Sequence, residues 1–300
     1  FTPTEDHTIK ADFDVAKQKY DNSPFIKDDG TIGYNALGTL DNYSDLLRKS
    51  NGNPAPRAGY KDELRMEREQ YSLFWEGNWA LGKSTIGIHH IESSNEGRTL
   101  PLTTSEREFL KSKNFANLAS AMNDPKFVAL LPRPDRIMES TNTTYSAKYE
   151  VPLSNHFLVV GTEYQDSKLK DGVFGMEKGN SGEAKEYYQY AIYAEDNWNL
   201  IDPLTLTLGT RYNYHQDFGD NVSPRVYLTY SATDNWTLKG GVSTGYKAPK
   251  ATDLYDGIVG FGGQGAIPQI GNPDLKPEKS VNYEVAAYYA ENKDNYDTVD

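Results

Sequence analysis

The chain has 300 residues, of which 22 are tyrosine and 25 are glycine, and it contains no cysteine. The lack of cysteine excludes disulfide frameworks, thiolate metal sites and cysteine nucleophiles. A formal net charge of −12 makes the chain a poor general binder of nucleic acid, because affinity for phosphate depends on clustered positive charge. No run approaches the roughly 18 to 20 apolar residues that a membrane-spanning helix needs, whereas a membrane-spanning strand needs only about 9 to 11 residues.

The clearest pattern along the chain is an alternation of apolar and polar residues with a period of two. From Leu204 to Tyr214, leucines and tyrosines alternate with threonine, glycine, arginine and asparagine. This pattern is typical of a strand with one apolar and one wet face. In chain order, the same pattern predicts eleven strands at residues 4–17, 66–78, 83–93, 140–151, 156–167, 185–198, 204–214, 223–231, 236–247, 279–290 and 295–300.

The connections between these strands alternate in length. Tight turns are expected at residues 78–83, 152–155, 199–203, 231–235 and 291–295. Long loops are expected at residues 21–63, 95–139, 168–184, 216–222 and 248–278. Tight turns on one side and long loops on the other are typical of outer-membrane β-barrels, in which the long loops are extracellular.

The aromatic residues favour a membrane β-barrel over a soluble β-sandwich. Four tryptophans lie close to tight turns, where an interfacial girdle is expected: Trp75, Trp79, Trp198 and Trp236. Amphipathic strands with long loops also describe a soluble β-sandwich. The apolar face of a sandwich prefers valine, isoleucine and leucine, however, and here that face is rich in tyrosine. The predicted fold class is therefore all-β, a transmembrane antiparallel β-barrel with long extracellular loops.

Three motifs in the last third of the chain carry a family resemblance. They are Ser223-Pro224-Arg225, then Lys239-Gly240-Gly241-Val242-Ser243-Thr244-Gly245-Tyr246-Lys247-Ala248-Pro249, then Gly271-Asn272-Pro273-Asp274-Leu275-Lys276-Pro277-Glu278-Lys279-Ser280. In this order they resemble signatures of the TonB-dependent receptor barrel, within the ferric catecholate group of the enterobactin and colicin I receptor type. The motif glycines relieve crowding in a strand, and Pro249 marks the end of pairing because proline cannot donate to a ladder. These residues are expected to build the barrel.

The resemblance implies an outer-membrane receptor that binds a ferric catecholate siderophore and imports it with energy from TonB. Residues 1–300 are then expected to be part of a barrel of about 22 strands. An N-terminal plug, a TonB-binding box and the C-terminal barrel strands of such a receptor are not found in this sequence. Iron is expected only as part of the bound siderophore, with no cofactor of the protein's own. Outer-membrane lipid and bacteriocins are the other expected partners, and nucleic acid is not one.

The long loops are where ligand contact is expected. Residues 46–68 carry six basic and three acidic side chains, and residues 98–136 carry seven basic and four acidic ones, so both segments attract anions on an acidic chain. A guanidinium group pairs with oxyanions and stacks on rings, which suits an anionic aromatic chelate. The candidate ligand-binding residues are Arg57, Tyr60, Arg133 and Arg136. The alternative is that these arginines are solvated or hold the loops together through ion pairs. Residues 103–130 are expected to form short helices that begin at a Ser or Thr cap.

Catalytic and metal-binding readings find no support. His89 and His90 are adjacent on a strand, so their rings point to opposite faces and cannot chelate one metal. No HExxH, GxSxG or Walker motif is present, and the chain is not expected to be an enzyme. Two alternatives to the ferric siderophore receptor stay open. One is a receptor of the same architecture for haem, cobalamin or another iron chelate, and the other is a soluble β-rich glycan-binding domain or enzyme.

Overall fold

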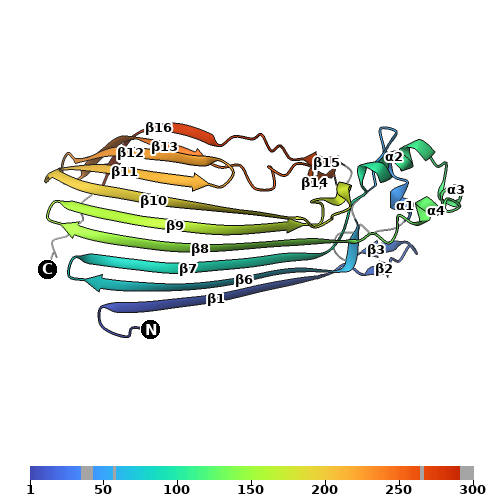
Figure 1. The fold of residues 1–300 in the computed structure, drawn as a ribbon, viewed down its shortest axis with the longest axis horizontal. Coiled ribbons are helices and arrows are strands. Elements are labelled where there is room, and N and C mark those ends of the chain that lie inside the picture. The colour runs from blue at the N-terminus through green and yellow to red at the C-terminus, as the bar shows by residue number, and fades with distance from the viewer. Residues whose placement is uncertain (35–42, 57–58, 264–266, 291–300) are drawn as a thin grey trace, which may run out of the picture.

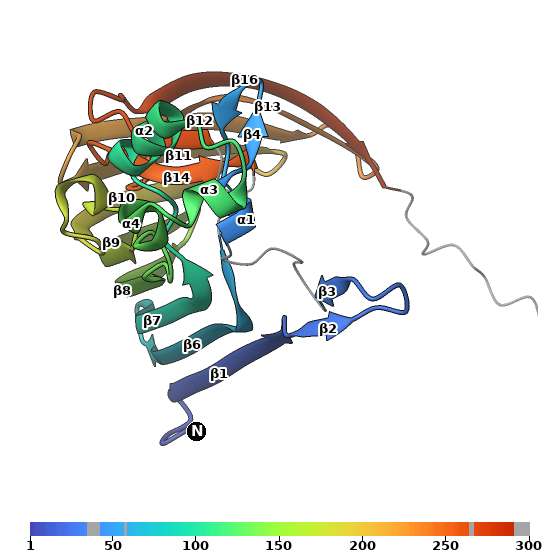
Figure 2. The same ribbon diagram turned by 90° about the vertical axis from the view of Figure 1, so that its right-hand side faces the viewer.

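The computed structural model describes residues 1–300 except 35–42, 57–58, 264–266 and 291–300. Its main feature is one antiparallel sheet of ten long strands that pair in the order in which they occur in the chain. Figure 2 shows the sheet curving like part of a cylinder wall. The strands are β1 (His7–Asp21), β6 (Tyr60–Trp79), β7 (Gly82–Thr99), β8 (Asp135–Leu153), β9 (His156–Asp171), β10 (Ala184–Ile201), β11 (Leu204–His215), β12 (Gly219–Ser231), β13 (Trp236–Lys247) and β16 (Glu278–Tyr289).

The first ten predicted strands each correspond to one strand of this sheet, and the eleventh, at 295–300, lies outside the described residues. Several strands extend further towards the long loops than predicted. Strand β6, for example, begins at Tyr60, six residues before its predicted start at 66. The alternation of apolar residues fades there while backbone pairing continues, so the sequence pattern marks only the amphipathic part of each strand. In the described residues the sheet is open, and β1 and β16 are its two edge strands.

The two ends of the sheet differ, as the sequence predicts. Figure 1 shows hairpin turns at one end and the helices and short strands gathered at the other. The smaller elements are β2 (Pro24–Ile26), β3 (Ile32–Tyr34), α1 (Tyr43–Leu46), β4 (Lys49–Ser50), β5 (Asn53–Pro54), α2 (Thr104–Lys113), α3 (Leu118–Ala121), α4 (Pro125–Val128), η1 (Met176–Lys178), β14 (Ile258–Gly262) and β15 (Ile267–Ile270). The loop expected at 216–222 is shorter than predicted, because β12 already begins at Gly219.

The pairing register separates the sheet into an apolar and a polar face. Leu206 lies opposite Trp198 on one side and Leu228 on the other, so an apolar row crosses three strands. No other described sheet is large enough to cover this face, since the remaining three have two strands each. Its side chains are exposed and include Phe13, Leu73, Ile86, Tyr145, Val160, Ile192, Leu208, Val226, Leu238 and Tyr283. Such exposure is costly in water and favourable in hydrocarbon.

Aromatic rings border the apolar face at both ends. At the turn end, His7 stacks on Trp75 and His156 stacks on Trp198, with ring centroids 5.5 and 5.1 Å apart. Towards the loop end, a row of tyrosines crosses four strands through contacts of 5.0 to 6.2 Å between centroids. Its members are Tyr145, Tyr164, Tyr188, Tyr190 and Tyr214. Two aromatic rows around an apolar band are what a membrane-spanning barrel wall requires.

Candidate functional site

The first two long loops, residues 22–59 and 100–134, pack together above the sheet. Leu46 from the first loop is buried in one cluster with residues of the second, among them Leu110 and Phe127. The Tyr43 hydroxyl donates a 3.0 Å hydrogen bond to the Val128 carbonyl, which joins α1 to the end of α4. Residues that are far apart in the sequence therefore form one small apolar core outside the barrel wall.

A second core joins the other two long loops, residues 172–183 and 248–277. The rings of Phe174 and Tyr255 stack with centroids 4.5 Å apart, and the Tyr255 hydroxyl donates a 2.6 Å hydrogen bond to the Glu183 carboxylate. Burial and the neighbouring carboxylate raise the pKa of Tyr255 to about 12. Leu100 belongs to this core as well, so the loop that carries α2 contacts both cores.

The two cores are linked through α2. The backbone N–H of Thr104 donates to the Glu177 carboxylate at 2.9 Å, and the Arg107 guanidinium lies 5.2 Å from the centre of the Phe261 ring. We refer to the described residues of 43–56, 100–134, 172–183 and 248–277 as the loop assembly. It forms a packed unit at the loop end of the sheet, and the β2–β3 hairpin stands apart from it (Figure 2).

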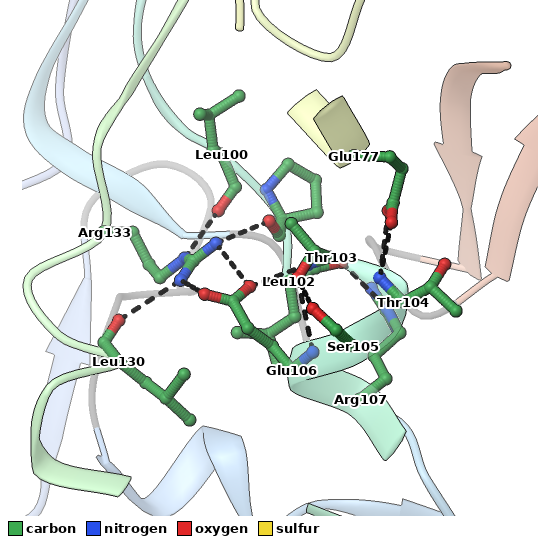
Figure 3. A network of polar contacts seen from close by, with 11 residues as sticks. Leu100, Leu102, Thr103, Thr104, Ser105, Glu106, Arg107, Leu130, Arg133 and Glu177 are labelled. Carbon is green, nitrogen blue, oxygen red and sulfur yellow. Dashed lines mark hydrogen bonds and ion pairs between the residues drawn. The ribbon is translucent and has the colours of Figure 1, made fainter. Parts of the chain in front are cut away.

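Arg133, one of the predicted ligand-binding residues, lies inside the loop assembly (Figure 3). Its guanidinium makes two hydrogen bonds to the Glu106 carboxylate, of 2.8 and 3.0 Å, and others to the carbonyls of Leu100 and Pro101. Glu106 also closes the capping box of α2 with Thr103. Burial raises the pKa of Glu106, but the bonds from Arg133 and Thr103 outweigh it and hold this pKa below its ordinary value. The Arg133 side chain is only 9% exposed.

Arg136 and Tyr60 lie in one register row with Arg98. Arg98 is paired with Tyr60 on β6 and with Arg136 on β8, and its guanidinium lies 5.6 Å from the centre of the Tyr60 ring. Arg136 also forms a bidentate ion pair of 2.8 and 2.7 Å with Asp171 at the end of β9. The sequence thus predicted two members of this row and missed Arg98, whose only sequence signal was its place in a basic segment. Arg57 lies outside the described residues.

The polar face below the loop assembly carries charged pairs and two hollows. In the smaller hollow, of about 470 Å³, Arg211 bonds Glu163 at 3.2 Å and lies over the Tyr193 ring, and Arg225 is paired with Glu195. The larger hollow, of about 600 Å³, is lined by residues of β1, β6, β7, β8 and β9. Charged and amide side chains make this face hydrophilic, as the sequence predicted for the side that lines the water-filled lumen of a barrel.

Glycines on the polar face make room for large neighbours. A Cβ atom on Gly241 would lie 2.4 Å from the Tyr227 ring, and one on Gly245 would lie 2.5 Å from the Ser280 hydroxyl. Gly240 has nothing closer than 3.6 Å. Two of the three motif glycines therefore relieve crowding, as expected, and a Cβ on the third would meet the Glu284 carbonyl only at an ordinary van der Waals distance. Strand β13 ends at Lys247, two residues before Pro249.

The histidine pair is separated as expected. His90 lies next to Thr143 on the apolar side, with its Nδ1 atom 2.7 Å from the threonine hydroxyl, and His89 points to the other face. Among the residues that the structure describes, no group of three or more His, Asp and Glu is placed to hold a metal ion. None of the described helices has the length and apolar character needed to cross a membrane.

A single curved sheet with one apolar and one polar face, tight turns at one end and packed loops at the other defines the wall of a membrane receptor barrel. The chain matches the family described as "TonB dependent receptor-like, beta-barrel" over residues 12–298, and it belongs to this family. The family consists of receptors and transporters, not enzymes.

Proteins that are similar to this chain in sequence or fold include outer-membrane and siderophore receptors. The iron-regulated outer membrane virulence protein of Vibrio cholerae is 36% identical over 52% of this chain, and the ferrienterobactin receptor of Escherichia coli is 25% identical over 89%. The siderophore receptor PirA of Pseudomonas aeruginosa shares the fold, with a TM-score of 0.63, 20% identity and 97% of this chain covered. The matched regions are 23%, 37% and 42% of these proteins, so the chain spans less than half of their length.

Proposed function

We propose that this chain is part of an outer-membrane receptor that binds a ferric catecholate siderophore and imports it with energy from TonB. The observation that carries the proposal is the row of Tyr60, Arg98 and Arg136 at the strand ends, which lies between the loop assembly and the polar wall. Two arginines and a tyrosine ring suit a ligand that is both anionic and aromatic. Three relatives named for ferric enterobactin or ferrienterobactin support the catecholate class.

The proposed roles of the four predicted ligand-binding residues differ. Tyr60 and Arg98 are proposed to contact the siderophore. Arg136, whose side chain is 11% exposed and paired with Asp171, is proposed to hold this row in place and to add its positive charge. Arg133 is proposed to act through the shape of the loop, since its guanidinium is bonded to Glu106 and to backbone carbonyls. Arg57 stays a candidate on its charge alone. The iron is cargo in this proposal.

A second candidate cargo is cobalamin. The vitamin B12 transporter BtuB of Photobacterium profundum is 28% identical over 41% of this chain. Bacteriocins are a further proposed class of partner, because a packed surface of extracellular loops offers them a docking site. A solved complex of FpvAI with pyocin S2 shares the fold, with a TM-score of 0.55 and 12% identity.

The test is a binding screen of the purified full-length receptor in detergent. Quenching of tryptophan fluorescence would be followed with ferric enterobactin, a ferric hydroxamate, haem and cobalamin. We expect saturable binding of ferric enterobactin at least a hundredfold tighter than that of the other three. Uptake of radioactive iron from the same chelate should require TonB in whole cells. Preference for cobalamin would favour the second candidate, and no binding of any ferric catecholate would contradict the proposal.

A further inference from the structure

A carboxylate lies on the apolar face of the sheet, towards the turn end. Asp196 on β10 is paired with Leu158 on β9 and with Leu208 on β11, so its neighbours on both sides are apolar. Leu208 is 40% exposed on this face. A charged side chain is costly in apolar surroundings unless it is hydrogen-bonded or paired with an opposite charge. Asp196 therefore needs polar partners that the apolar row does not supply.

His156 satisfies only part of this carboxylate. Its Nδ1 atom lies 2.7 Å from Oδ2 of Asp196, whereas Oδ1 is shielded and has no hydrogen-bond partner among the residues that the structure describes. The Asp196 side chain is still 27% exposed. Rotation about its Cβ–Cγ bond exchanges the two oxygens at little cost, because this torsion is broad. The carboxylate can therefore accept a second donor from outside the barrel.

An aromatic platform stands beside the carboxylate. Trp198 and His156 are direct partners on β10 and β9, and their rings stack with 5.1 Å between centroids and 22° between planes. An indole face attracts cations better than the other aromatic rings do, and the indole N–H can donate to an oxyanion. The carboxylate and the indole together suit a ligand that carries an ammonium group next to a phosphate.

The position of these three residues is that of a lipid headgroup. His156 is the first residue of β9, directly after the tight turn from β8, and Trp198 lies close to the turn from β10 to β11. Short turns of outer-membrane barrels face the periplasm, and interfacial tryptophan rings lie at headgroup level. Barrel strands are tilted, so a register row changes its depth in the membrane from strand to strand. Asp196 lies one row inward from the stacked rings, where the apolar band begins on this strand.

A second stack at the same end of the sheet shows what Asp196 adds. The ring of His7 stacks on that of Trp75 on β6, with 5.5 Å between centroids. Two residues before Trp75, β6 carries Leu73, whereas β10 carries Asp196 two residues before Trp198. The two stacks share their rings and their place at the membrane border. Only the second has a carboxylate in this position.

We propose that Asp196, Trp198 and His156 bind the headgroup of a phospholipid that has a primary ammonium group. The ammonium donates to the Asp196 carboxylate and lies against the indole ring. A quaternary ammonium has no N–H to donate, and an anionic headgroup is repelled by the carboxylate, so the site discriminates between lipid classes. It lies on the outside of the barrel and does not depend on which cargo the receptor carries.

Competition between lipids tests the proposal. The full-length receptor in detergent would be mixed with equal amounts of phosphatidylethanolamine, phosphatidylcholine and phosphatidylglycerol with the same acyl chains, and bound lipid would be measured by native mass spectrometry. We expect wild type to prefer phosphatidylethanolamine about fivefold or more over each of the others. Asp196→Asn keeps the shape of the side chain and should abolish this preference. Asp202→Asn, in the exposed turn after β10, is the control and should keep it.

Three results would overturn the site. They are no preference for phosphatidylethanolamine in wild type, the same preference in D196N as in wild type, and an equal loss in D202N, which would trace the preference to net charge. We expect the melting temperature of D196N in detergent to be no lower than that of wild type, because the substitution removes a charge from an apolar face.

A second pair of variants tests the ring separately from the carboxylate. Trp198→Leu removes the indole beside Asp196, and Trp75→Leu removes the indole of the other stack. We expect W198L to lower the preference for phosphatidylethanolamine about threefold and W75L to leave it unchanged. An equal loss in both variants would assign the preference to interfacial tryptophans in general and would contradict a site at Asp196.

Discussion

Arg133 and Glu106 form a bidentate ion pair, with Nη1 2.8 Å from Oε1 and Nη2 3.0 Å from Oε2. The same guanidinium bonds the carbonyls of Leu100 and Pro101, where the chain leaves β7 for the loop. One side chain thus fixes the start of the loop, the first turn of α2 and the return towards β8, as Figure 3 shows. This arginine, which the sequence suggests for ligand contact, is bonded at three points within its own loop.

The first prediction concerns this pair. Glu106→Gln should loosen residues 100–134, because it removes the carboxylate charge from bonds that contribute about 1.5 to 3 kcal/mol. Hydrogen exchange of amides in this loop should become about tenfold to a hundredfold faster, as measured by mass spectrometry on the full-length receptor. Glu108→Gln, on an exposed position of the same helix, is the control and should leave exchange unchanged. Equal exchange in both variants would show that the pair does not stabilise the loop.

The second prediction is the pH dependence of the same loop. The pKa of Glu106 is lower in the folded loop than its ordinary value of 4.5, so its ionised form is favoured by folding. Its contribution to stability is therefore present above about pH 4.5 and is lost as the pH falls through the folded value. Limited proteolysis of the loop between pH 7 and pH 3 should show increased cleavage in acid. The E106Q variant should lack this acid step, and an identical acid step in E106Q would place its origin elsewhere.

The third prediction tests which face lies in lipid. Val226 is exposed on the apolar face of β12, where its partners Leu208 and Val242 are apolar as well. Val226→Arg should destabilise the barrel by about 2 to 4 kcal/mol, which is the cost of a lipid-facing charge near the bilayer midplane. Thr207→Arg is the control, since Thr207 lies on the polar face of β11 opposite Tyr227. Urea unfolding of the full-length receptor in lipid vesicles measures both. A larger cost for T207R than for V226R would reverse the assignment of the faces.

The fourth prediction concerns a paired glycine and aromatic ring. A Cβ atom on Gly87 would lie 2.2 Å from the ring of Phe74, its direct partner on β6, so Gly87→Ala should cost about 1 to 3 kcal/mol. Most of that cost should disappear when Phe74→Ala is added, because the ring is the nearest obstacle. Gly240→Ala should be close to neutral in the same unfolding experiment, because its Cβ would be 3.6 Å from the nearest atom, an ordinary van der Waals distance. Additive effects of G87A and F74A would mean that the two residues do not compete for space.

The sequence by itself determined the strands, their faces and the class of protein. A period of two is a local property, so the first ten strands could be placed from it. The sequence also predicts short helices in residues 103–130 that begin at a Ser or Thr cap, and α2 begins at such a cap, Thr103. The three motifs pointed to the family that residues 12–298 then matched. The strands were predicted too short at their loop ends, because backbone pairing continues there without an apolar face.

Only the tertiary structure decided how the loops join and where the wall is hollow. The contact of Tyr43 with Val128 and that of Glu177 with Thr104 connect residues more than seventy positions apart, and no local pattern encodes such packing. Arg98 joined Tyr60 and Arg136 only because the register set the three in one row. The hollow has the same origin, since side chains from five strands became neighbours through pairing. Periodicity fixes which face a side chain takes, whereas register and long-range packing fix which side chains it meets.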